Sequence, residues 1–182
     1  MHSNLNHASP VLQVNDLCVQ FKTPNGLVTA VNNVSFDVAQ GETVALVGES
    51  GSGKSVTSLG VMRLTPPAPR ALLSGEVWFK GPRDKQPVDL LSLSEDEMRK
   101  RRGLDIAMVF QEPMTSFNPL HTIGRQIAEG VRVHHKISKA AAMDRAAELL
   151  DMVGISAPQE RLKNYPHEMS GGMRQRAMIA MA

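Results

Sequence analysis

The chain has 182 residues, a length that suits one domain with a buried core. Its formal net charge is only +2, so the overall charge argues for no particular class of partner. The single cysteine, Cys18, excludes an internal disulfide and favours a reducing compartment. No run of about 18 apolar residues occurs, so we expect no membrane-spanning segment. Residues 1–10 lack the apolar stretch of a secretory signal, and we expect a short disordered lead-in there.

The first segments alternate apolar and polar residues, which is the pattern of half-buried strands. Residues 11–21 and 27–38 show this pattern, and the sequence TPNG at 23–26 predicts the turn between them. Residues 43–48, TVALVG, are a continuous apolar run, which is typical of a strand buried on both faces. The order predicts an antiparallel N-terminal sheet followed by a strand of a parallel sheet.

A helix is expected after this apolar run, to about Leu64, because Pro66 and Pro67 prevent its continuation. Residues 75–81, GEVWFKG, predict another strand, and residues 105–110, DIAMVF, predict a second buried strand.

Ser94 and Glu97 predict a capping box at the start of a short helix that Gly103 can close. The basic residues at 98–103 could bind nucleic acid or anionic lipid, but they more simply complement the carboxyl end of that helix.

Two amphipathic helices are expected in the second half, at about 123–134 and after Ser138, the second ending at Gly154. The residues that share the apolar face of the second helix are Met143, Ala146, Ala147, Leu150 and Val153. The chain therefore has the pattern of an α/β protein with an antiparallel N-terminal part and a helical part inserted after residue 111.

The strongest motif is GESGSGKS at 48–55, which fits G-x-x-x-x-G-K-[ST] between a predicted strand and a predicted helix. Glycines allow such a loop to wrap phosphates, and the helix N-terminus adds positive potential. Lys54 is expected to reach the β- and γ-phosphates, and the Ser55 hydroxyl to bind Mg²⁺. The predicted ATP-binding residues are Gly48, Glu49, Ser50, Gly51, Ser52, Gly53, Lys54, Ser55 and Val56.

This loop is followed by VFQEP at 109–113 and MSGGMRQR at 169–176. In that order and at those spacings, the three motifs resemble the nucleotide-binding subunit of an ABC transporter. The resemblance implies a P-loop ATPase of the ABC type, with a parallel-sheet core, that uses ATP and Mg²⁺. It assigns Gln111 to the Q-loop, where the side chain contacts Mg²⁺ or positions the attacking water.

The SGG element is the signature of that family and faces the nucleotide of the opposite subunit. The residues that carry it here are Ser170, Gly171, Gly172 and Met173. An aromatic residue at the end of the first strand stacks on adenine in the family, and Phe21 occupies that position.

A narrower resemblance is to the oligopeptide, dipeptide and glutathione importer branch. It is carried by GETVALVGESGSGKSVTSL, FQEPMTSFNPLHTIGRQIAE and YPHEMSGGMRQRAMIAMA, and it extends over about 11–182. The usual signature has Leu and Gln flanking SGG, where this chain has Met169 and Met173, and the second change is typical of the branch.

The narrower resemblance implies a peripheral subunit on the cytoplasmic face of a bacterial inner membrane. Its partners would be a second ABC ATPase subunit, two membrane-spanning permease subunits and, indirectly, a solute-binding protein, with no nucleic acid. A helical subdomain is expected at about 112–169, and its part from Gln111 to Gly154 would dock on the permease. The identity of the imported solute, and whether the protein has one or two such domains, stay open.

Members of this family also use an apolar strand ending in Asp-Glu and a histidine after a later strand. No run of four apolar residues precedes Asp-Glu here, and none of the six histidines follows a strand pattern. We therefore expect residues 11–182 to be a partial nucleotide-binding domain that is incomplete at its C-terminus, and expect the chain alone to be inactive in ATP hydrolysis.

The alternative is a non-transport P-loop ATPase with the same signature, such as a DNA-repair or translation factor. The short spacing between Lys54 and Ser170, together with the balanced charge, favours transport.

Overall fold

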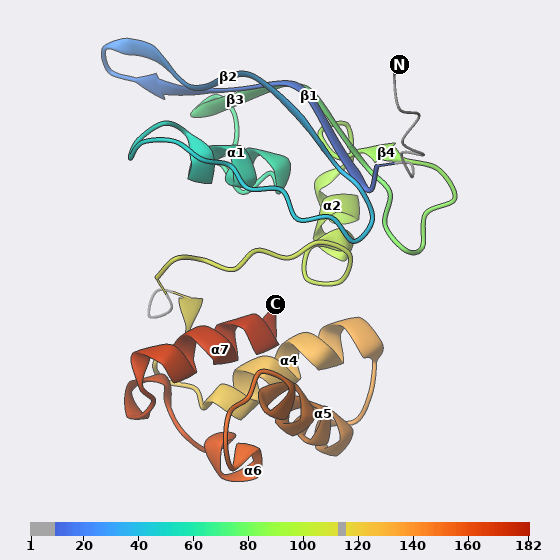
Figure 1. The fold of residues 1–182 in the computed structure, drawn as a ribbon, viewed down its shortest axis with the longest axis vertical. Coiled ribbons are helices and arrows are strands. Elements are labelled where there is room, and N and C mark those ends of the chain that lie inside the picture. Colours follow the sequence, from blue (N-terminus) through green and yellow to red (C-terminus); the bar gives the residue numbers. More distant parts are fainter. Residues whose placement is uncertain (1–9, 113–115) are drawn as a thin grey trace, which may run out of the picture. The chain divides into compact units, whose positions relative to one another are not determined.

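The computed structural model describes residues 10–112 and 116–182. The predicted disordered lead-in therefore falls almost entirely outside the described residues. The chain divides into two compact units, Met1–Ile106 and Ala107–Ala182, whose helices and strands are drawn in Figure 1. Each unit has its own cluster of buried apolar residues.

The first unit is built on a four-stranded antiparallel sheet in the order β2-β1-β3-β4. Its strands are β1 (Leu12–Thr23), β2 (Gly26–Val38), β3 (Ala71–Phe79) and β4 (Val88–Asp89). The predictions of the first two strands and of the turn between them are confirmed. Thr23 Oγ1 closes that turn by donating to the Gly26 carbonyl at 2.8 Å. The strand predicted at 75–81 begins earlier, at Ala71, because its first residues pair with β1.

Helix α1 (Lys54–Val61) follows the glycine-rich loop and packs against β1 and β2. It ends before Leu64, as the two prolines predict. A Cβ atom on Gly60 would lie 3.1 Å from Val19, so the small residue lets the helix approach the strand closely. Buried side chains of the sheet, including Val14 and Leu17, complete this core.

Helix α2 (Glu95–Arg101) has the predicted capping box. Ser94 Oγ accepts from the Glu97 amide at 3.3 Å, and the Glu97 carboxylate accepts from the Ser94 amide at 2.9 Å. The last turn of α2 contains three basic residues of the cluster at 98–103, which complement the carboxyl end of the helix as expected. Arg102, the next residue, caps a different helix, α1. Its guanidinium donates to the carbonyls of Met62 and Arg63, both at 2.9 Å, at the carboxyl end of α1.

Two aspartates and two arginines tie the loop after β3 to the last residue of α2 and to the loop that follows it. Arg101 donates to both carboxylate oxygens of Asp84, at 2.7 and 2.8 Å, and Arg83 donates to both oxygens of Asp105, at 2.8 and 3.2 Å. The Arg101 guanidinium lowers the pKa of the Asp84 carboxyl below its ordinary value. Asp84 therefore stays ionised to a lower pH than an isolated aspartate.

The two predicted buried strands are wrong in this structure. Residues 43–48 and 107–110 are irregular. The side chains of 43–48 are exposed, with Val47 at 92%, and so are those of Val109 and Phe110, at 44% and 42%, while Met108 is half-buried. A parallel strand needs hydrogen-bonded neighbours and cover on both faces, and no described strand pairs with either segment. The expected parallel-sheet core is therefore not formed among the described residues.

The second unit is helical. Its elements are α4 (Ile123–His135), α5 (Lys139–Met152), α6 (Pro158–Arg161), the 3₁₀ helix η1 (Pro166–Glu168) and α7 (Gly171–Met181). The helices predicted at 123–134 and after Ser138 are confirmed. Ser138 Oγ caps α5 by accepting from the Ala141 amide at 3.1 Å.

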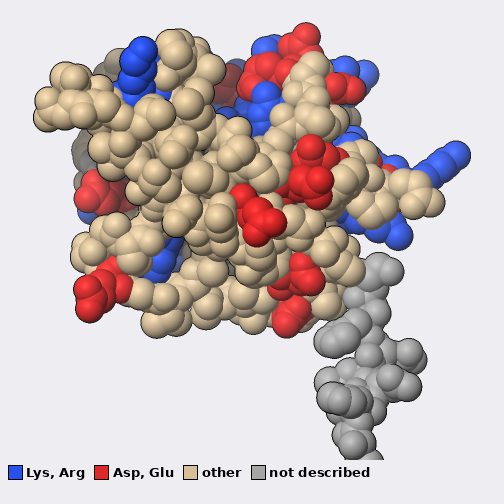
Figure 2. All heavy atoms as spheres, turned by 90° about the horizontal axis from the view of Figure 1, so that it is seen from above, with Lys and Arg blue, Asp and Glu red and all other residues tan. Residues whose placement is uncertain are grey.

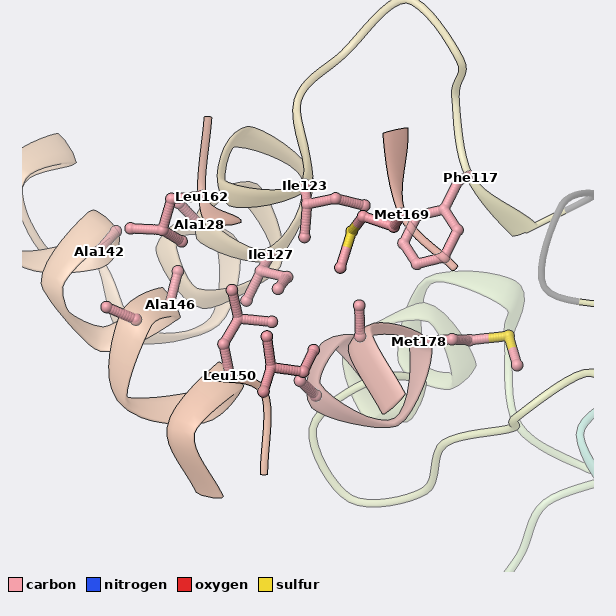
Figure 3. Packing of buried hydrophobic residues seen from close by; sticks show 14 residues of the cluster. Phe117, Ile123, Ile127, Ala128, Ala142, Ala146, Leu150, Leu162, Met169 and Met178 are labelled. Atoms are coloured by element: carbon pink, nitrogen blue, oxygen red, sulfur yellow. The ribbon is translucent and has the colours of Figure 1, made fainter. Parts of the chain in front are cut away.

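The core of the helical unit lies between α4, α5 and α7 (Figure 3). The predicted apolar face of α5 is confirmed, because Ala146, Ala147 and Leu150 are buried and the other two predicted residues pack against them. Gly124 lies so close to Leu162 that an added Cβ atom would be 2.8 Å from it. None of the helices in the described part of the chain is long and apolar enough to cross a membrane.

Candidate functional site

The glycine-rich loop at 48–55 is held against the sheet by one glycine. Gly53 precedes α1 with φ +90, in the left-handed region, and a Cβ atom there would lie 2.4 Å from the Ala30 carbonyl oxygen of β2. A side chain at this position would therefore both strain the backbone and push the loop away from the strand. Gly51 also lies in the left-handed region, with φ +81, but a Cβ atom placed on it would have no neighbour within 4 Å.

The loop curls around the ammonium group of Lys54. That group donates to the carbonyls of Gly48 and Glu49, at 2.8 and 2.5 Å, and lies 3.2 Å from Ser52 Oγ. All three acceptors are neutral oxygens, so the positive charge has no carboxylate partner in this arrangement. The loop thus presents a cation at its centre, where an anion could bind.

The start of α1 adds to this positive character. The first helical hydrogen bond is donated by the Thr57 amide to the Gly53 carbonyl at 2.8 Å, and the Thr57 hydroxyl donates to the same oxygen at 3.0 Å. The amides before Thr57 therefore lie ahead of the helical ladder, at the positive end of the helix. Ser55 is exposed there, while Val56 packs against the core of the sheet unit.

The described residues contain no group of three or more His, Cys, Asp or Glu side chains that could hold a metal ion. Ser55 offers one hydroxyl, which suits an Mg²⁺ ion that arrives with phosphate oxygens and waters as its other ligands. The chemistry of this position therefore fits a nucleotide-borne ion better than a resident one.

Phe21 lies near the end of β1, paired with Val28 on β2 and Ala71 on β3. Its ring is partly buried and packs against the core, while Val28 beside it is 52% exposed. The predicted stacking of Phe21 on adenine stays a prediction.

Gln111 is exposed and belongs to the second unit, whereas the loop at 48–55 belongs to the first. The predicted meeting of Gln111 with the phosphates and Mg²⁺ therefore stays a prediction. Residues 113–115, within the segment expected to dock on a permease, lie outside the described residues.

Ser170 caps α7. Its hydroxyl accepts from the Met173 amide at 3.3 Å, and Met173 packs against the helical core. Gly171 and Gly172 are exposed, and no atom lies within 4 Å of a Cβ placed on either. The amino end of α7 is thus open to solvent and unobstructed by side chains, as an anion site requires.

Several supporting contacts are not evident from the sequence. Arg174 donates to the carbonyls of Met169 at 2.9 Å and Pro166 at 3.3 Å, which fixes the turn before Ser170. The contact of Gly53 with Ala30 also joins distant parts of the chain. Motif spacing identifies the loop and the signature but carries no information on these tertiary partners.

The family model for ABC transporters matches residues 31–182. The protein therefore belongs to the ABC transporter family. It is 52% identical over 175 residues to a probable peptide ABC transporter ATP-binding protein of Sinorhizobium fredii, covering 96% of this chain and 50% of the relative. It is also 52% identical over 172 residues to the oligopeptide transport ATP-binding protein OppD of Bacillus subtilis, covering 94% of this chain and 46% of the relative. The chain spans about half the length of these curated relatives.

Solved structures agree. A dimeric bacterial ABC transporter cassette, MJ0796, matches with a TM-score of 0.78 and 26% identity over 93% of this chain and 68% of the other. A post-hydrolysis dimer of the same cassette, bound to ADP and phosphate, matches with a TM-score of 0.76 and 25% identity over the same shares. The predicted α/β fold class of the ABC type and the predicted family are thereby confirmed. ATP hydrolysis is an activity of this family in general.

The contact of Gly53 with β2 predicts different costs for two glycine substitutions. Gly51→Ala and Gly53→Ala both place a side chain in the left-handed region, at about 1–2 kcal/mol each. Only Gly53→Ala also meets the Ala30 carbonyl, which should add about 1–3 kcal/mol of overpacking. Denaturant unfolding followed by fluorescence of Trp78, the single tryptophan, measures both free energies of unfolding. Equal losses for the two variants would contradict the contact.

Proposed function

We propose that the loop at 48–55 binds ATP with Mg²⁺. The observation that carries this proposal is the loop itself, which wraps the ammonium group of Lys54 at the start of α1. Phosphate oxygens are charged and accept stronger hydrogen bonds than the neutral oxygens that now hold this group. ATP would therefore draw Lys54 towards its β- and γ-phosphates, while Ser55 contributes a ligand to Mg²⁺.

The remaining nucleotide contacts are part of the same proposal. The backbone from Gly48 to Val56 would surround the phosphates, and Phe21 would stack on adenine. Gln111 would reach Mg²⁺ or the attacking water in the assembled site.

Lys54→Ala should weaken MgATP binding by about 2 kcal/mol, or roughly 30-fold, because hydrogen bonds from a charged group are lost. Isothermal titration calorimetry of the parent and the variant measures this change. Lys22→Ala, which removes an exposed lysine of the same unit, is the matched control and should bind as the parent does. Equal affinities for Lys54→Ala and the parent would rule out the proposed phosphate contact.

At the level of the whole protein, we propose an ATP-binding subunit that energises import of peptides or related small solutes, such as dipeptides, oligopeptides or glutathione. Support comes from the relatives named as peptide and oligopeptide transport proteins. The proposed partners are a second ABC ATPase subunit, two membrane-spanning permease subunits and, indirectly, a solute-binding protein. The proposed location is the cytoplasmic face of the inner membrane.

We further propose that residues 11–182 form part of a nucleotide-binding domain with a helical subdomain at about 112–169, and that its segment from Gln111 to Gly154 docks on the permease. This segment begins at Gln111. A segment that starts at the γ-phosphate can convert the state of the nucleotide into movement of a second body.

Residues 1–182 by themselves should hydrolyse ATP only at background level. Lys54, Ser55 and Gln111 supply positioning, but no residue among the 182 fits the Asp-Glu pair that holds the metal and orients water in this family. Steady-state phosphate release measures this. Turnover that persists in the parent and disappears in Lys54→Ala would contradict the expectation.

The signature should act across a pair of chains. Ser170→Arg places a bulky side chain at the open amino end of α7, so it should abolish ATP-dependent pairing while leaving ATP binding by a single chain nearly unchanged. Ser138→Arg is the matched control, because it removes an equivalent helix cap, worth about 1 kcal/mol, elsewhere in the helical unit.

Light scattering with and without MgATP measures the pairing, and calorimetry measures the binding. If Ser170→Arg removes nucleotide binding by the single chain, the signature acts within its own chain and the proposal of shared sites is wrong.

A further inference from the structure

The connection between α4 and α5 carries a concentration of positive charge (orange, Figure 1). We call residues 132–139 the basic corner. It contains Arg132, Lys136 and Lys139, together with two histidines, and no aspartate or glutamate. Because these residues span the end of one helix, a short turn and the start of the next, they lie together at one end of the α4–α5 pair.

The cations of the basic corner have no partners in the described part of the chain. Arg132, Lys136 and Lys139 are all exposed, and none forms an ion pair or side-chain hydrogen bond there. In the basic cluster at 98–103 of the sheet unit, by contrast, the three arginines form ion pairs, and one of them also caps a helix. On the face shown in Figure 2, basic side chains also lie next to acidic ones.

Helix stability does not account for all of this charge. Arg132 lies in the last turn of α4, where a cation complements the helix dipole. Lys139, however, is the first residue of α5, at the positive end of that helix, and the first turn of α5 contains no acidic residue. A cation is mildly unfavourable there, so Lys139 does not serve the stability of α5.

Two exposed aliphatic side chains lie among the cations. Val133 is 68% exposed and Ile137 is 36% exposed. Neither belongs to the buried cluster of the helical unit. The basic corner therefore combines unpaired positive charge with a small apolar surface, which is the combination found on segments that lie on anionic bilayers.

We propose that the basic corner binds the anionic phospholipid headgroups of a membrane surface. Arg132, Lys136 and Lys139 would contact headgroup phosphates, while Val133 and Ile137 would enter the headgroup layer. An acidic protein surface would need carboxylates matched in position to three cations on a turn, whereas lipids move to meet them. A lipid surface also accommodates the aliphatic pair. This binding is independent of the proposed nucleotide site, which lies in the other unit.

Co-sedimentation of the 182-residue chain with vesicles tests the proposal. At low ionic strength the parent should bind mixed phosphatidylcholine–phosphatidylglycerol vesicles and leave pure phosphatidylcholine vesicles unbound. The triple variant Arg132→Gln, Lys136→Gln, Lys139→Gln should bind the anionic vesicles about 100-fold more weakly, because each cation contributes about a factor of 5 near such a surface. Added salt should weaken the binding of the parent.

Two further triple variants separate the basic corner from general effects. Lys22→Gln, Lys80→Gln, Lys85→Gln removes the same charge from exposed positions of the sheet unit and should bind vesicles much as the parent does. Arg132→Lys, Lys136→Arg, Lys139→Arg keeps the charge and should keep the binding. Circular dichroism verifies the fold, and MgATP calorimetry should show the same affinity for all variants.

Three results would overturn the proposal. The parent could bind neutral and anionic vesicles equally, or the two neutralising variants could lose the same binding. The basic-corner variant could also bind vesicles as the parent does and yet lose binding to a poly-glutamate peptide, which would identify an acidic protein as the partner.

Discussion

The contact between Gly53 and the Ala30 carbonyl is the constraint on which the loop at 48–55 depends. It sets the loop against β2 and begins α1 with a backbone conformation that favours glycine. With the loop fixed there, Lys54 folds back onto the carbonyls of Gly48 and Glu49. The ammonium group of Lys54 is thereby held within the loop before any anion binds. Preorganisation of this kind lowers the cost of ordering the site when a ligand binds.

The signature residues at the start of α7 are held by contacts within the helical unit. Ser170 caps α7, Arg174 holds the preceding turn, and Met173 anchors the first turn of the helix in the core of the helical unit. The two glycines between them remain uncovered. The start of α1 in the sheet unit and the start of α7 in the helical unit are therefore both open and positively polarised, and each is stabilised by packing within its own unit. This arrangement fits the proposal that the starts of α1 and α7 contact different nucleotides when two chains pair.

The sequence predicts elements well where the signal is local. The predicted capping box of Ser94 and Glu97 is present, and the helix predicted after Ser138 begins there, because both signals lie within four residues of the groups that they satisfy. Residues 43–48 show the opposite case, because an apolar run becomes a buried strand only when neighbouring strands pair with it. For the loop at 48–55, the sequence motif correctly located the glycines. It could not reveal that Gly53 meets Ala30, since that contact depends on how β2 passes the loop.

The central claim, that ATP sits in the loop of one chain while the signature of the same chain stays free, has a direct test. Amide resonances of the isotope-labelled protein can be followed by nuclear magnetic resonance as MgATP is added, at protein concentrations where the chain is monomeric. The account predicts large shifts from Gly51 to Ser55 and none from Ser170 to Met173. Unchanged loop resonances, or equal shifts at the signature of a single chain, would contradict it.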